Sequence, residues 1–178
     1  IAFLLMKLVL FWGIKKKYEK IFRYCQIFSS GCVALAHGMN DAQKSMGLIT
    51  LGLFSSKIIP SMQIPLWVIL SCAFVMGMGT CTGGFRIIGT LGYKITPLVP
   101  AQGVAAEMSS SFIIVLASFL GIPVSSTHMI VGAITGVGSA RGHKKVQWST
   151  MQKLAIAWTF TLPGSAAVSS FIYNFFIN

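Results

Sequence analysis

The sequence predicts an all-α, polytopic membrane protein that contains broken helices and a helical hairpin. Composition is the first observation behind this prediction: 54% of the 178 residues are hydrophobic and only 10% are charged, against about 25% charged in a typical soluble domain. The mean hydropathy of +0.77 is the second observation. The third is the pattern, because apolar runs long enough to cross a bilayer alternate with short basic blocks. Together these observations exclude an ordinary soluble domain.

The positive charge also indicates a membrane protein. The 14 lysines and arginines outnumber the three acids, which gives a net charge of +11. Most of the basic residues lie between apolar runs, in 15–23, at Arg86 and Lys94, and in 140–145 together with Lys153. Lysine and arginine gather in this way in cytoplasmic loops. We therefore expect a multi-pass protein of the cell membrane (plasma or inner membrane), in contact with lipid, and no nucleic-acid partner.

The first part of the chain predicts one partial helix and one long, interrupted helix. Residues 1–14 resemble the cut end of a membrane helix, and no initiator methionine precedes them. We therefore expect a fragment of a longer protein, with 1–178 as a single transmembrane domain. The run 24–56 is longer than the roughly 20 residues that a crossing helix needs. Because its middle, HGMNDAQKS (37–45), is polar, we expect two helical halves that are broken near residues 38–40.

The next elements are a turn and a second span. Residues 57–63, with Pro60, predict a short turn on the far side of the membrane. Residues 66–82 return as an apolar span. This span ends in GMGTCTGG (77–84), whose glycines predict a flexible loop or a packing surface.

A helical hairpin and a last span complete the chain. The apolar stretches 101–120 and 124–140 are separated by Gly-Ile-Pro at 121–123, and both outer ends are basic, so the two arms should enter and leave on the same side. A re-entrant hairpin and two full spans both fit this pattern. Residues 147–177 predict the last span, bent at Leu-Pro-Gly in 162–164. Two GxxxG pairs, which permit close packing of helices, lie in the second arm at Gly132/Gly136 and Gly138/Gly142.

Two acids lie inside apolar stretches, where a carboxylate costs at least about 2.5 kcal/mol and usually faces a pathway or a partner. The first is Asp41. Asn40 and Lys44 are four residues apart, as are Asp41 and Ser45, so one helix face presents an amide, a carboxylate, an ammonium and a hydroxyl. The alternative is a carboxylate that pairs with Lys44 or Arg86 for packing alone.

The second acid is Glu107, which shares a helix face with Gly103, Ser110 and Ser111. Oxygen-rich surroundings suit a small hard cation, or a proton held on the carboxylate. His37 and His128 fit either a proton relay or a hydrogen-bonded structural role, and the sequence leaves both open. It also leaves open whether a metal binds.

The stretch PVSSTH (123–128) predicts a helix start, because Pro123 stands just before Ser125, Ser126 and Thr127. The N-terminus of a helix presents free N–H groups and a partial positive charge, which favour an anion. The hydroxyls add donors without adding charge. The alternative is an ordinary capped helix. No Walker loop, nucleophile–base pair or metal-ligand cluster is present in the sequence, so we do not expect an enzyme.

Three motifs carry a resemblance to a known family. They are AHGMNDAQKSMGLI, GYKITPLVPAQGVAAEMSSSF and GIPVSSTHMIVGAITGVGSARG. Over about 24–145 these motifs resemble, in the same order, the C-terminal half of the PiT family of inorganic phosphate transporters, and NDAQK resembles the bacterial branch. The resemblance implies one repeat of an inverted-repeat transporter, with a central site where hairpins from both halves meet. This chain contains one such repeat, so the other half of the site must be missing or supplied elsewhere.

The resemblance also implies a function and a set of residues. The function is secondary active transport of inorganic phosphate, coupled to Na⁺ or H⁺, and some bacterial members carry metal–phosphate complexes. The family's GxND motif corresponds to Gly38, Asn40 and Asp41, its hairpin tip to 125–127, and its intramembrane glutamate to Glu107. Partners would be phosphate, the N-terminal half of the same transporter and a second copy in a homodimer.

We therefore expect two groups of site residues and no cofactor beyond the coupling ion. Those for phosphate are Asn40, Ser125, Ser126 and Thr127. Those for the coupling ion or proton are Asp41, Glu107, Ser110 and Ser111. The alternative functions are a membrane anchor or assembly subunit, whose buried acids lock helices together, and a cation antiporter.

Overall fold

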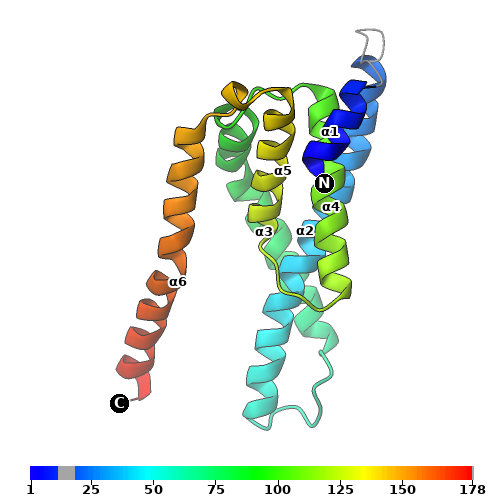
Figure 1. The fold of residues 1–178 in the computed structure, drawn as a ribbon. Coiled ribbons are helices and arrows are strands. Elements are labelled where there is room, and N and C mark those ends of the chain that lie inside the picture. Colours follow the sequence, from blue (N-terminus) through cyan, green and yellow to red (C-terminus); the bar gives the residue numbers. More distant parts are fainter. Residues whose placement is uncertain (12–18, 178) are drawn as a thin grey trace. The chain divides into compact units, whose positions relative to one another are not determined.

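The computed structural model describes residues 1–11 and 19–177, and every regular element in these ranges is helical (Figure 1). This confirms the all-α prediction. The elements are α1 (Ala2–Phe11), α2 (Glu19–Ser55), α3 (Leu66–Gly89), the π-helical turn η2 (Thr90–Lys94), α4 (Pro100–Phe119), α5 (Ser126–Arg141), the 3₁₀ turn η3 (His143–Lys145) and α6 (Trp148–Ile177).

The chain divides into two compact units, Ile1–Val146 and Gln147–Asn178. The first unit holds α1 to η3, and the second holds α6. The prediction of one transmembrane domain over 1–178 stays a prediction. Three described helices are long and apolar enough to cross a membrane, within 66–84, 100–119 and 148–176. The predicted second and last spans are therefore confirmed, and α6 continues as a helix past its internal Pro163.

Helix α2 corrects the predicted break at residues 38–40. It runs without interruption from Glu19 to Ser55 over 37 residues. A glycine in a helix costs only about 1 kcal/mol relative to alanine, so Gly38 alone does not end the helix. The polar side chains that suggested a break instead project sideways from an intact helix toward the rest of the unit. Residues 15–18 of the first basic block lie outside the described residues.

The end of α2 explains the turn that follows. The amide of Ile58 donates to the carbonyl of Leu53 and that of Lys57 to Phe54, both at 3.0 Å. These two bonds, with Lys57 at a φ of 56°, form a Schellman cap. The cap ends the helix and begins the connection predicted at 57–63.

Helix α3 corrects the predicted loop at residues 77–84, since the helix passes through all of them and ends at Gly89. Two threonine hydroxyls bond back to the helix: Thr80 donates to the carbonyl of Met76 at 2.9 Å and Thr82 to that of Met78 at 3.0 Å. Lipid offers no partner for a freed backbone group, so a spanning segment keeps its helical hydrogen bonds even where glycines are frequent.

The predicted hairpin is confirmed: α4 and α5 pack against each other and are joined by residues 120–125. Helix α4 starts with Pro100, and it ends in a second Schellman cap, where Gly121 adopts a φ of 67° and the amide of Ile122 donates to the carbonyl of Ala117 at 2.9 Å. Ser125 caps the start of α5. The break beside the predicted phosphate-binding residues therefore lies between α4 and α5, not inside α2.

Helix α4 lies at the centre of the first unit and packs against α1, α2 and α5 (Figure 1). Its buried residues are mostly small, such as Ala101, Ala105, Ala106 and Ser109. Small side chains let helix backbones approach closely in a membrane. This close approach brings the polar side chains of α2 against the hairpin.

Candidate functional site

Side chains of α2 reach the backbone that connects the two arms of the hairpin. The amide of Asn40 donates to the carbonyl of Val124 at 3.0 Å and to Asp41 Oδ1 at 2.8 Å. Lys44 Nζ donates to the same carbonyl and lies 3.0 Å from Asp41 Oδ1. The Val124 carbonyl precedes α5 and takes no part in helical hydrogen bonding. Its acceptor capacity is therefore satisfied by an amide and an ammonium from α2.

The second oxygen of Asp41 binds the start of α5. Ser126 Oγ donates to Asp41 Oδ2 at 2.9 Å, and His37 Nδ1 lies 2.8 Å from Ser126 Oγ and 3.3 Å from Asp41 Oδ2. Asn40 and Ser126 are almost fully buried, with exposed fractions of 4% and 2%. We call this group the tip cluster: His37, Asn40, Asp41 and Lys44 of α2, with Val124 and Ser126 of the hairpin.

The three hydroxyls predicted to bind phosphate have different surroundings. Ser125 Oγ accepts the amide of His128 at 3.3 Å, which is the ordinary cap that the sequence allowed. Ser126 donates to Asp41, whereas Thr127 is exposed in the first turn of α5. The structure thus brings Asn40, Asp41 and Ser126 together, with Thr127 beside them at the helix start. The pairing of Lys44 with Asp41 was one of the predicted alternatives, whereas its bond to the carbonyl of Val124 was not predicted.

A second polar group surrounds Glu107. Ser29 Oγ donates to Glu107 Oε2, and Gln26 lies alongside in a cavity of about 310 Å³ that Gly103 and Ser110 also line. A Cβ at Gly103 would come 2.3 Å from Gln26 Nε2, so the glycine makes room for this amide. We call Gln26, Ser29, Gly103 and Glu107 the Glu107 cluster.

Ser110 and Ser111 contribute less to this cluster than the sequence predicts. The hydroxyl of Ser110 donates to the carbonyl of Ala106 at 2.9 Å, and that of Ser111 to the carbonyl of Glu107 at 2.7 Å. Both hydroxyls therefore bind the backbone of α4 and not the Glu107 carboxylate. Ser110 still lines the cavity, and Ser111 is not among the residues that line it.

The two clusters are separate. Ser29 and Asp41 lie on one continuous helix, about 18 Å apart along its axis at 1.5 Å per residue. Glu107, on α4, contacts α2 at Ser29, whereas Asp41 contacts the hairpin tip farther along α2. Each acid therefore has its own partners.

Sequence reasoning missed Gln26, Ser29 and the carbonyl of Val124, and it left His37 open. A signal for the side chains was present, because residues 26, 29, 37, 40 and 44 recur at spacings that keep them close to one face of a helix. The expected break in α2 divided this stripe. No sequence pattern pointed to the carbonyl of Val124. A backbone carbonyl becomes available to side chains only where the chain is not helical, and that is known only from the structure.

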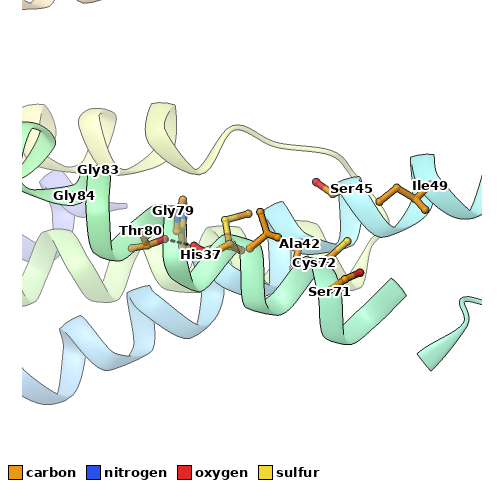
Figure 2. A pocket seen from close by; sticks show the side chains of 12 residues that line it. His37, Ala42, Ser45, Ile49, Ser71, Cys72, Gly79, Thr80, Gly83 and Gly84 are labelled. Atoms are coloured by element: carbon orange, nitrogen blue, oxygen red, sulfur yellow. Dashed lines mark hydrogen bonds between the residues drawn. The ribbon is translucent and has the colours of Figure 1, made fainter. Parts of the chain in front are cut away.

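A cavity of about 550 Å³ lies between α2 and α3, lined largely by small residues of both helices (Figure 2). Ala42 and Ser45 line it from α2, and Gly79 and Thr80 from α3. His37 belongs both to this lining and to the tip cluster. Among the described residues, no group of three or more His, Cys, Asp or Glu is placed to hold a metal ion.

The chain is similar in sequence to known phosphate transporters. A sequence family described as the phosphate transporter family matches residues 11–169. A probable low-affinity inorganic phosphate transporter of Rhizobium meliloti (strain 1021) is 41% identical over 175 residues, covering 96% of this chain and 52% of that protein. One of the same description in Bacillus subtilis (strain 168) is 40% identical over 174 residues, covering 97% of this chain and 52% of the relative.

A solved structure of a phosphate transporter is similar to this chain in fold. It is described as the sodium-dependent phosphate transporter, with a TM-score of 0.78 and 33% identity, and it covers 90% of this chain and 42% of that one. The chain spans about half the length of the two bacterial relatives. Because the family match extends over most of the sequence, the chain belongs to the phosphate transporter family.

Proposed function

We propose that the chain forms one half of a secondary active transporter that moves inorganic phosphate across the membrane, coupled to Na⁺ or H⁺. The observation that carries this proposal is the tip cluster, where an acid, an amide and an ammonium from an intact helix meet a helix start inside the hairpin. Both bacterial relatives are described as inorganic phosphate transporters. The other half of the site would come from an inverted repeat elsewhere in the full-length transporter.

Phosphate fits the hairpin tip for chemical reasons. The first turn of α5 presents backbone N–H groups and the positive end of the helix dipole, which favour an anion. Thr127 is exposed at this turn and Asn40 lies against it. Hydroxyl and backbone N–H donors add no charge of their own, and the charge of Lys44 is paired with Asp41. We therefore assign phosphate binding to the start of α5, with Thr127 as the exposed donor and Ser125 as the cap. Asn40 and Ser126 would donate to phosphate on exchanging their present bonds to Val124 and Asp41.

The acids would handle the coupling ion. A carboxylate beside a bound anion repels it, so a cation or proton must neutralise the carboxylate as phosphate enters. Asp41 contacts Ser126 at the proposed phosphate site, whereas Glu107 lines a separate cavity. The alternative of an assembly subunit also has a supporting observation, because Asp41 accepts the hydroxyl of Ser126 and Lys44 donates to the carbonyl of Val124, and such bonds between α2 and the hairpin can hold helices together. The other suggested packing partner, Arg86, lies outside the side chains that the structure describes.

Phosphate binding to the purified full-length transporter tests the proposal. A hydrogen bond to a charged group contributes about 1.5–3 kcal/mol, and about 1.4 kcal/mol changes affinity tenfold. Replacing Thr127 by Ala should therefore weaken phosphate binding about tenfold or more, and the Ser126→Ala, Thr127→Ala double variant should weaken it further. Thr127→Ala is the sharper of the two, since Ser126→Ala also removes a partner of Asp41.

The matched control is Ser30→Ala, which deletes an exposed α2 hydroxyl that donates to the carbonyl of Ile27 at 2.9 Å. This variant should bind phosphate as the unmodified protein does. Unchanged affinity in the double variant would exclude the hairpin tip as the phosphate site. A protein that moves no phosphate at all, with Asp41→Asn reducing only stability, would establish the assembly subunit instead. Cation exchange without phosphate binding would establish an antiporter.

A further inference from the structure

Lys44 occupies an unusual place in the tip cluster. Its ammonium contacts two oxygens, Asp41 Oδ1 at 3.0 Å and the carbonyl of Val124. The amide of Asn40 binds the same two oxygens. One oxygen carries a formal charge, and the other belongs to backbone that has left the helix. Two oxygens, one of them charged, therefore face the ammonium between α2 and the hairpin.

This oxygen pair is also what a hard cation requires. Carboxylate and carbonyl oxygens are the preferred ligands of such cations, and carbonyls at interrupted helices coordinate sodium in membrane transporters. A lysine ammonium carries the same charge as Na⁺ on a compact head with three donors. In this structure the ammonium stands where a cation bound to Asp41 Oδ1 and Val124 would stand.

We propose that Lys44 is a tethered cation that fills the coupling-ion position at Asp41, so that this position needs no sodium ion. The inference rests on the proposed function and specifies which ion the tip cluster accepts. A covalently attached charge neutralises Asp41 at any external sodium concentration. The driving ion then acts elsewhere, as a proton or cation at the Glu107 cluster.

The exposure of the ion pair favours this role over packing alone. The side chains of Lys44 and Asp41 retain 37% and 25% of their accessible surface. A small cation could thus reach the carboxylate if the ammonium were absent. His37, 3.3 Å from Asp41 Oδ2, is the other titratable partner that the structure records for this carboxylate.

Removing the tethered charge should create a requirement for sodium. We would prepare the full-length transporter with Lys44→Gln and measure phosphate affinity in sodium chloride and in choline chloride at equal ionic strength. In choline, Lys44→Gln should bind phosphate about tenfold more weakly than the unmodified protein, equivalent to about 1.4 kcal/mol, because Asp41 is left uncompensated. In sodium, the affinity should recover to within about threefold.

Two control variants complete the experiment. Lys44→Arg keeps a tethered charge and should bind phosphate equally in both salts. Lys20→Gln removes an exposed lysine at the far end of the same helix and should behave like the unmodified protein.

Each remaining outcome decides the question. If sodium does not restore binding to Lys44→Gln, or if that variant binds normally in choline, Lys44 is not a substitute for a cation. A variant that folds in sodium but not in choline, judged by elution and thermal unfolding, would support the proposal. One that folds in neither salt would make Lys44 a structural partner and overturn it. An unmodified protein that binds no phosphate in either salt would instead contradict the proposed function.

Discussion

At the scale of single residues, the two intramembrane acids have different environments. Asp41 contacts an ammonium, an amide, a hydroxyl and an imidazole. Glu107 receives a hydroxyl from Ser29 and faces a cavity. A carboxylate that already pairs with a fixed cation has less need of a mobile one. Glu107 is therefore the acid that we expect to respond most directly to the driving ion.

Replacing Glu107 by Gln should abolish gradient-driven phosphate uptake in liposomes and leave phosphate binding at the hairpin tip within about threefold of normal. The amide keeps the size of the side chain and its bond to Ser29, but it carries no charge and cannot take up the driving ion. The control is Glu19→Gln, which removes an exposed acid paired with Arg23 at 3.3 Å. Normal uptake by Glu107→Gln would make Glu107 a structural residue.

The sequence was sufficient to select the two acids and the hairpin tip, but not to predict which side chains they contact. Polarity within apolar runs was enough to select Asp41, Glu107 and the hairpin tip, because each costs free energy in a membrane. The bond from Ser29 to Glu107 joins positions 78 residues apart. Such a contact depends on how α2 packs along α4, and neither local pattern nor spacing encodes that packing. The roles of the site residues stay predictions until binding and uptake are measured.

At the scale of elements, periodicity and turn residues located the helices but misjudged their interruptions. The hairpin was predictable, because Gly121 and Pro123 occur together and each disfavours a continued helix. The continuity of α2 and α3 was not, because isolated glycines weaken helices in water, whereas a membrane penalises any unbonded backbone.

The two GxxxG pairs of α5 show how unevenly the same motif can be used. A Cβ at Gly138 would come 2.9 Å from Val146 Cγ2 and 3.1 Å from Thr96 Cγ2, whereas one at Gly132 would meet nothing within 4 Å. Both neighbours of Gly138 are β-branched and stiff. Gly138→Ala should therefore lower the free energy of unfolding by about 1–3 kcal/mol, and Gly132→Ala should raise it by about 0.5–1 kcal/mol.

Thermal unfolding of the two variants in one detergent measures this difference. The comparison is matched, since both substitutions add one methyl group to the same helix. If Gly138→Ala proved at least as stable as Gly132→Ala, the close contact of α5 with the segment around Thr96 would be wrong.

At the scale of the whole molecule, the family match and the apolar composition both indicate a membrane protein. The chain is a multi-pass protein of the cell membrane that belongs to a family of transporters and not of enzymes. Within the first unit, the start of α2 and the end of α5 lie at one end, and the connection after α2 lies at the other (Figure 1).

This arrangement predicts a membrane orientation. Single cysteines at Lys20 and Lys144 should be labelled only from the cytoplasm, and a cysteine at Lys57 only from outside, because lysine-rich ends stay in the cytoplasm. A membrane-impermeant thiol reagent applied to intact cells makes the measurement, in a background without native cysteines. Position 16, in the same basic block as Lys20, should behave like Lys20 although it lies outside the described residues. Labelling of position 20 from outside would reverse the topology.

The continuity of α2 has a mechanical consequence. At 1.5 Å per residue its 37 residues extend about 55 Å, well beyond the roughly 30 Å of the hydrocarbon layer. A continuous helix of this length is rigid, so it fixes the distance between the tip cluster and the Glu107 cluster. Under the proposed function, we expect opening to one side of the membrane and then the other to come from movement of the α4–α5 hairpin against this helix. The hydrogen bonds that join Asn40, Asp41 and Lys44 to the hairpin tip would then break and re-form in each transport cycle.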